Sequence, residues 1–141
     1  SAGVDASNHP SGEVSYPPPD PDAAARELSE DIERRTGVRI PVVITDTEYT
    51  LGLGTQDVAR GSYGIRPAAG RFAPPDRMGK PKFGGADPVT HELAAAALIM
   101  GQTDEGYPAV VARGLRWEPF DGGMAQARPA AWPTEGLSEE S

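Results

Sequence analysis

The run from Pro41 to Thr47 constrains the fold more than any other part of this chain. Four apolar and mostly β-branched residues, Pro-Val-Val-Ile, lead directly into Thr-Asp-Thr. This pattern predicts a buried strand, at residues 38–45, that presents polar side chains at its C-terminal end. A carboxylate and two hydroxyls on a rigid strand can bind a cation or a phosphate. The alternative is that Asp46 only starts a turn or caps a helix.

A helix is predicted immediately before this strand, at residues 21–36. Asp20 is a good N-cap, Pro21 suits the first helical position, and Gly37 suits the position just after the last turn. Leu28 and Ile32 are spaced i, i+4 among charged residues. The spacing predicts an amphipathic surface helix whose charges form a solvated face.

A second helix is predicted after Asp87 and Pro88, in the run VTHELAAAALIMGQ, with Gly101 at its end. The run is apolar almost all round, which predicts a buried helix, and its alanines allow close approach of another backbone. His91 and Glu92 fall in the first turn, where they read as a polar helix end.

Glycine and proline dominate the remaining segments. The chain of 141 residues has 17 glycines and 15 prolines, and residues 48–85 show no sustained period. A short strand within 58–65 and a second strand at 107–113 are the other regular elements expected. The predicted fold is therefore α+β: a mixed sheet, two principal helices and long Gly/Pro-rich loops. With 38% hydrophobic residues, we expect a partner segment or a second chain to complete the core.

Charge and composition exclude several classes of function. The net charge is −8 and no basic patch is visible, which argues against nucleic-acid binding. There is no cysteine, so neither a disulfide framework nor a thiolate metal site can form. No apolar run is long enough to span a membrane and no signal peptide is visible, so we expect a cytoplasmic protein with no membrane partner.

The opening residues 1–16 form a loop rich in oxygen ligands, among them Asp5, Ser7 and Asn8. His9 lies beside them and before a proline, where a solvated histidine is favoured over a metal ligand. If this loop approaches the end of the strand at Asp46, two acidic segments converge on one site and together supply hard ligands for a cation.

Four segments, in this order, carry a resemblance to a known family: SAGVDASN, VVITDT, GTQDVARGSYGI, and HELAAAALIMGQ with the VVARGL that follows it. The chain resembles the C-terminal half of the coenzyme F-420-0:L-glutamate (γ-glutamyl) ligase family, from residue 1 to about Arg128. The resemblance implies an α+β fold, an intertwined homodimer, and an enzyme that uses GTP and divalent metal (Mn or Mg). Such an enzyme joins an amine such as L-glutamate to a small-molecule carboxylate through an amide bond.

The resemblance also implies particular site residues. Asp5 matches a metal-binding aspartate, and Asn8 belongs to the same motif. Asp46 and Thr47 match an Asp-Thr pair that holds metal near the nucleotide phosphates, with Asp46 also a candidate catalytic residue. Gln56 and Asp57 match polar residues that contact the nucleotide. The arginine-bearing stretch of the family is here EYTLGLG, without positive charge, so Lys80 or Arg77 would have to supply one.

Two further hypotheses stay open. If a precursor cuts itself before Ser1, the new hydroxyl and α-amine would make an N-terminal nucleophile, and the product would be an amide hydrolase that requires no cofactor. Alternatively, the chain is a non-catalytic subunit of the same fold. In each case we expect a ligase-like domain at residues 1–128, an irregular acidic tail at 129–141, a homo-oligomer, and an N-terminal half supplied as a separate chain or a removed segment.

Overall fold

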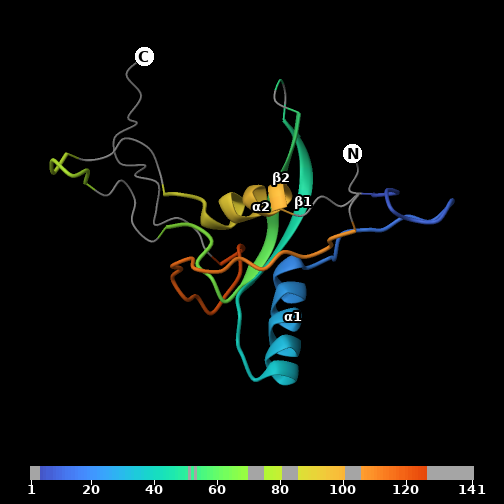
Figure 1. Cartoon of the computed structure of the whole chain (residues 1–141), viewed down its shortest axis with the longest axis horizontal. Helices are drawn as coiled ribbons and strands as arrows, with labels where there is room; N and C mark the ends of the chain where they lie inside the picture. Colours follow the sequence, from blue (N-terminus) through green and yellow to red (C-terminus); the bar gives the residue numbers. More distant parts are fainter. Residues whose placement is uncertain are drawn as a thin grey trace, which may run out of the picture.

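The computed structural model describes residues 4–50, 52, 54–69, 75–80, 86–100 and 106–126. Their elements follow in the order α1 (Pro21–Thr36), β1 (Val42–Thr50), β2 (Gly54–Tyr63) and α2 (Val89–Met100). The α+β class is therefore confirmed, and Figure 1 shows the two strands as one long hairpin with a helix on either side. Ser1, Gly101 and the predicted tail at 129–141 lie outside the described residues.

Helix α1 has the ends that the sequence predicts. The Asp20 carboxylate accepts from the N–H of Ala23 at 2.9 Å, and Gly37 adopts a left-handed φ of 73°. The N–H of Gly37 donates to the carbonyl of Glu33 at 2.8 Å, which closes the last turn. These contacts satisfy backbone groups that a helix leaves unpaired at its ends.

The buried face of α1 differs from the predicted one. Ala25 and Ser29 are buried, whereas Leu28 is 51% exposed. Small side chains let the helix approach the hairpin closely, and the hydroxyl of Ser29 donates to the carbonyl of Ile40 at 2.6 Å. This hydrogen bond joins α1 to the residues that lead into β1.

The hairpin is longer than either predicted strand. β1 continues past Thr45 to Thr50, so Asp46 and Thr47 lie in the middle of a strand and not at its end. The short strand expected within 58–65 is confirmed, but β2 begins earlier, at Gly54. Residues 45–49 and 54–56 are exposed, so this half of the hairpin has no buried face to produce a hydrophobic alternation.

A β-bulge interrupts the antiparallel register. Ile44 pairs with Gly61 and Thr45 pairs with Ala59, which leaves Arg60 as the extra residue of β2. A bulge bends its strand and redirects the side chain of the extra residue. The position of Arg60 is therefore set by the irregularity in the pairing.

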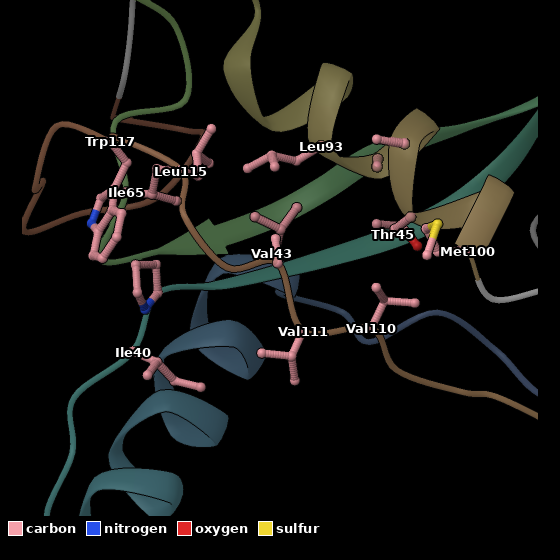
Figure 2. A pocket seen from close by; sticks show the side chains of 15 residues that line it. Ile40, Val43, Thr45, Ile65, Leu93, Met100, Val110, Val111, Leu115 and Trp117 are labelled. Atoms are coloured by element: carbon pink, nitrogen blue, oxygen red, sulfur yellow. The ribbon is translucent and has the colours of Figure 1, made fainter.

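The two helices pack against opposite faces of the hairpin (Figures 1 and 2). On one face, Gly61 lies directly against Pro21, and a Cβ at Gly61 would overlap the Pro21 backbone. On the other face, the backbone N–H of Ala59 donates to His91 Nδ1 at 3.1 Å and ties α2 to β2. The small buried core between them consists of the apolar residues Ala25, Val58, Ala59, Tyr63, Ile65 and Ala94.

Three expectations about the fold need correction. Residues 107–113 are not a strand in this structure, although the segment is described throughout. The described sheet contains one antiparallel pair and no parallel pair, so the mixed sheet is not seen in these residues. Helix α2 is buried on one side only: Thr90 and Ala94 are buried, whereas Ile99 is 80% exposed and Met100 is 74% exposed. For residues 107–113 and for the exposed end of α2, the described part of the chain provides no neighbouring layer against which their apolar side chains could pack.

No helix among the described residues has the length and apolar character needed to cross a lipid bilayer.

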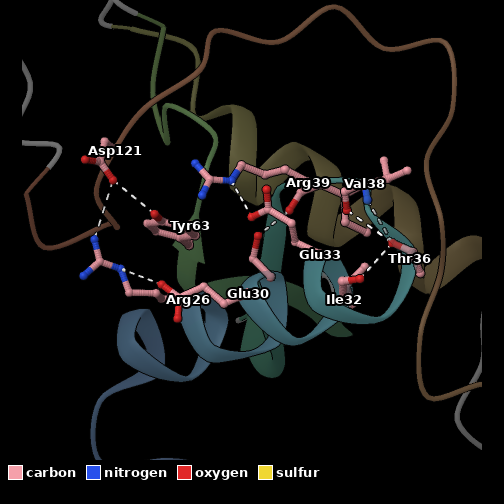
Figure 3. Close-up of polar contacts among 11 residues, drawn as sticks. Arg26, Glu30, Ile32, Glu33, Thr36, Val38, Arg39, Tyr63 and Asp121 are labelled. Atoms are coloured by element: carbon pink, nitrogen blue, oxygen red, sulfur yellow. Dashed lines mark hydrogen bonds and ion pairs between the residues drawn. The ribbon is translucent and has the colours of Figure 1, made fainter.

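The C-terminal segment, residues 106–126, is fastened to the body at its far end. The carboxylate of Asp22 accepts from the backbone N–H groups of Ser62, Met124 and Ala125 at 2.8–2.9 Å. Asp121 accepts from the hydroxyl of Tyr63 at 3.1 Å and lies 3.5 Å from Arg26, as Figure 3 shows.

The aromatic residues of this segment pack against the body to different extents. Phe120 packs under the guanidinium of Arg66, 4.9 Å from its ring centroid. Trp117 is half exposed and lines a groove described below. Trp132 lies outside the described residues.

Candidate functional site

The outer half of the hairpin brings together four of the predicted site residues. Thr47 pairs with Asp57 and Glu48 pairs with Gln56 across the two strands, while Asp46 pairs with Val58. The sequence segments VVITDT and GTQDVARGSYGI are therefore neighbours in space. Their juxtaposition follows from the antiparallel register, which the sequence pattern alone does not specify.

These four residues divide between the two faces of the hairpin. Because side chains alternate along a strand, Thr47 and Asp57 share one face, and Asp46 and Gln56 share the other. On the first face the Thr47 hydroxyl donates to Asp57 Oδ1 at 2.7 Å. The Thr45 hydroxyl lies 3.4 Å from the other oxygen of the same carboxylate. This face offers one carboxylate held by two hydroxyls.

The opposite face carries a positive charge that the sequence analysis did not predict. Arg60 Nη2 lies 2.7 Å from Glu48 Oε1, and Arg60 Nε lies 3.5 Å from Asp46 Oδ2. Arg77 and Lys80, the predicted sources of positive charge, instead belong to a separate turn closed by Asp76. The signal for Arg60 was present in the segment GTQDVARGSYGI, but only the bulge and the cross-strand pairing bring it beside Asp46.

The opening loop is a small unit closed by its own hydrogen bonds. Asp5 and Ser15 form an antiparallel bridge, and Asn8 adopts a left-handed φ of 57°. The hydroxyl and the N–H of Ser7 both donate to the Asp5 carboxylate, and these bonds lower the pKa of Asp5. His9 is exposed, as expected for a solvated histidine.

The predicted meeting of this loop with the hairpin is not seen. Within the described residues no hydrogen bond or ion pair joins Asp5 or Asn8 to Asp46 or Thr47. In Figure 1 the loop projects to the right of the hairpin. Its role as a second ligand source therefore stays a prediction.

The metal-binding prediction can be tested against this geometry. Carboxylate and hydroxyl oxygens are suitable ligands for Mn²⁺ or Mg²⁺. However, Asp46 and Thr47 point to opposite faces, and Asp46 already pairs with Arg60. In the part of the chain that the structure describes, no three His, Cys, Asp or Glu side chains are grouped to hold a metal ion. The described residues alone therefore do not provide a complete set of ligands for a metal ion.

A groove of about 470 Å³ opens between α2, the first half of β1 and the C-terminal segment. Figure 2 shows that its walls are almost entirely apolar, with Leu93 and Met100 from α2, Val43 from β1, and Val110, Val111 and Trp117 from the C-terminal segment. Thr45 lines the groove and also approaches Asp57. The groove is thus adjacent to the hairpin face that carries Thr47 and Asp57.

Comparison with known proteins places this arrangement in context. A model of the family described as F420-0:Gamma-glutamyl ligase matches residues 1–114. A protein named Coenzyme F420:L-glutamate ligase from Methanopyrus kandleri is 42% identical over 125 residues, which cover 86% of this chain and 50% of that protein. The protein of the same name from Methanothermobacter thermautotrophicus is 38% identical over 138 residues, which cover 95% of this chain and 54% of that protein.

A third relative of the same name, from Methanosarcina mazei, is 37% identical over 116 residues, which cover 81% of this chain and 46% of that protein. The resemblance inferred from the four sequence segments is thereby confirmed. The chain spans about half the length of the curated relatives that it matches.

Proposed function

The chain belongs to the F420-0:gamma-glutamyl ligase family, and from this we propose that it is part of an enzyme that forms an amide bond between L-glutamate and a carboxylate of a coenzyme F420 precursor. The observation that carries the proposal is the family match over residues 1–114. The grouping of Asp46, Thr47, Gln56 and Asp57 on one half of the hairpin supports it, because the resemblance assigns all four to the site.

We propose GTP and a divalent metal, Mn²⁺ or Mg²⁺, as cofactors. The nucleotide would drive amide formation, and the cation would neutralise its phosphates. The Asp57 carboxylate and the Thr47 hydroxyl, or Asp46 on the other face, are the oxygen donors that this chain offers. Since the described residues do not form a metal site by themselves, the remaining ligands would come from elsewhere in the assembled enzyme.

Arg60 is proposed as the residue that contacts an anionic group of the nucleotide or substrate. Guanidinium groups bind phosphates and carboxylates through paired hydrogen bonds. In this structure Arg60 pairs with Glu48 and Asp46. These two carboxylates hold the guanidinium in position before an anion binds. A bound anion would contact the same guanidinium.

We propose two kinds of partner. One is a polypeptide segment that corresponds to the half of the relatives that this chain does not match, and the other is further copies of the chain in a homo-oligomer. The absence of cysteine is compatible with the expected cytoplasmic location. The hydrolase hypothesis depends on Ser1, which lies outside the described residues, and no observation on the described residues favours it or the non-catalytic hypothesis.

The proposal is tested by titrating Mn²⁺ and GTP into this chain assembled with its complementary half, followed by an assay of glutamate addition. Asp46→Asn is expected to weaken Mn²⁺ binding about tenfold or more, because one carboxylate ligand is lost. Asp31→Asn is the matched control, since Asp31 also pairs with arginines but lies on α1. Assembled protein that binds neither Mn²⁺ nor GTP would contradict the proposed function.

A further inference from the structure

The groove and its surroundings expose more apolar side chain than the described residues cover. Ile99 and Met100 on α2 are exposed, and Val111 on the C-terminal segment is 69% exposed. Soluble proteins seldom leave a continuous apolar surface of this kind uncovered unless it contacts another molecule. Because the surface continues along α2 beyond the groove, a small molecule inside the groove would leave much of it exposed.

The backbone of the C-terminal segment also lacks partners along this surface. Residues 107–113 form no helix, strand or turn, and within the described residues no hydrogen bond reaches their backbone N–H or C=O groups. Their sequence, YPAVVAR, is typical of a strand. A row of free backbone groups beside an apolar groove is the arrangement that accepts an added β-strand.

The segment is held in place for such a partner. Its far end is fastened through Asp22 and through Glu118, whose carbonyl accepts from the N–H of Arg66 at 2.9 Å. The ordering cost of strand addition is lower when one of the two strands is already fixed.

We propose that an extended apolar strand, from the half of the ligase that this chain does not match, pairs with residues 107–113 and fills the groove. This inference rests on the proposed function, because it takes the relatives as its guide to the complete enzyme. The unmatched length supports this occupant, since each of the three relatives described above has about half of its chain outside the match.

The test uses the unmatched half of the Methanopyrus kandleri relative as a separate polypeptide probe. Its competence is first verified by its binding to the matched half of that same relative. The probe is then titrated into this chain, and hydrogen exchange is measured with and without it. We expect binding, and slower exchange by about tenfold or more for those amides of residues 107–113 that face the added strand, which are alternate residues and do not include Pro108.

Val111→Asp is expected to weaken binding about tenfold or more, because it places a charge in the groove wall. Met78→Asp is the matched control, since Met78 is also an exposed apolar residue but lies in the separate turn at 75–80. The affinity of this variant for the probe should stay within about twofold of that of the unchanged chain.

Three results would overturn the inference. A probe that binds its own relative's matched half but not this chain would contradict it, as would binding without protection of residues 107–113. A homodimer of this chain that Val111→Asp dissociates would assign the groove to a second copy. None of these readouts requires ligation, so an assembled but inactive complex would contradict only the proposed function.

Discussion

Arg60 lies across the hairpin from Glu48, with its Nη2 atom 2.7 Å from Glu48 Oε1, because a β-bulge makes it the extra residue of β2. The same guanidinium approaches Asp46, a residue that the family resemblance assigns to metal binding. Both partners of the pair are partly exposed, so an ion pair of this kind contributes little to stability. A role in binding an anion would therefore be measurable separately from any effect on folding.

We predict that Arg60→Gln lowers the free energy of unfolding by less than about 1 kcal/mol, because the ion pair is exposed. In the assembled enzyme the same variant should weaken GTP binding by about tenfold or more, since a charged hydrogen-bond donor is lost. Calorimetric titration and urea unfolding measure the two effects. Arg39→Gln, which breaks an exposed pair with Glu33, should match it in stability and leave GTP affinity unchanged. Equal GTP affinity in both variants would remove Arg60 from the site.

We predict that Asp22→Ala lowers the free energy of unfolding by about 2–3 kcal/mol, because three backbone N–H groups lose a charged acceptor. Asp22→Asn should lose less, since its amide oxygen can still accept. The control is Glu30→Ala, which removes only an exposed ion pair at 4.0 Å with Arg26, and a change below about 0.5 kcal/mol is expected. Urea unfolding of the three variants measures these differences, and equal losses for Asp22→Ala and Glu30→Ala would show that Asp22 does not fasten the C-terminal segment.

The same carboxylate predicts how stability depends on pH. Burial by itself would raise the pKa of Asp22, but the N–H groups of Ala125, Ser62 and Met124 outweigh it and lower the pKa. In the unfolded chain the Asp22 carboxyl has an ordinary pKa of about 4. Between that value and the lower folded-state pKa, the unfolded chain therefore binds more protons than the folded chain. The contribution of Asp22 to the free energy of unfolding is therefore fully present above the unfolded-state pKa. It is lost as the pH falls through the lower folded-state pKa.

Unfolding measured from pH 7 down to pH 3 tests this dependence. Asp5 also has a lowered pKa, so the comparison with Asp22→Asn isolates the contribution of Asp22. The variant should show a shallower loss of stability below about pH 5. Parallel curves for the two proteins would contradict the prediction.

We predict that Gly61→Ala destabilises the chain by about 2 kcal/mol or more, because the added methyl group would overlap the backbone of Pro21. A methyl group at Gly52 meets open space, although its φ of 82° makes any side chain there strained by about 1 kcal/mol. Gly52→Ala is therefore the control for the loss of a glycine, and thermal unfolding compares the two. If both variants melt at the same temperature, α1 does not pack tightly against β2.

The local features of the fold could be predicted because they depend on neighbours in the sequence. Asp20, Pro21 and Gly37 define the ends of α1 through capping and backbone conformation, which involve only a few adjacent residues. The outer half of the hairpin could not be predicted in the same way. Glu48 and Gln56 face solvent, so the alternation that marks a strand is missing, and only their pairing across the turn makes them a sheet.

The candidate site shows the same division. The types of its residues, such as Asp46 and Asp57, could be read from the sequence and from its resemblance to a family. Their placement could not, because the strand that was expected to end at Asp46 continues and sends Asp46 and Thr47 to opposite faces. The pairing of Arg60 with Glu48 could not be predicted for a related reason. The two residues lie on different strands, and Arg60 reaches Glu48 from the β-bulge, where it is the extra residue of β2.

By itself, the sequence determined the family, the α+β class, the extent of α1 and the chemical types available to a site, because these depend on short-range patterns. Only the tertiary structure decided which carboxylate faces which side of the hairpin and which arginine accompanies it, since strand register and bulges depend on long-range pairing. It also showed that the C-terminal end of α2 and residues 107–113 remain exposed. The reason is physical: apolar side chains show which residues favour burial, but not which layer of the structure buries them.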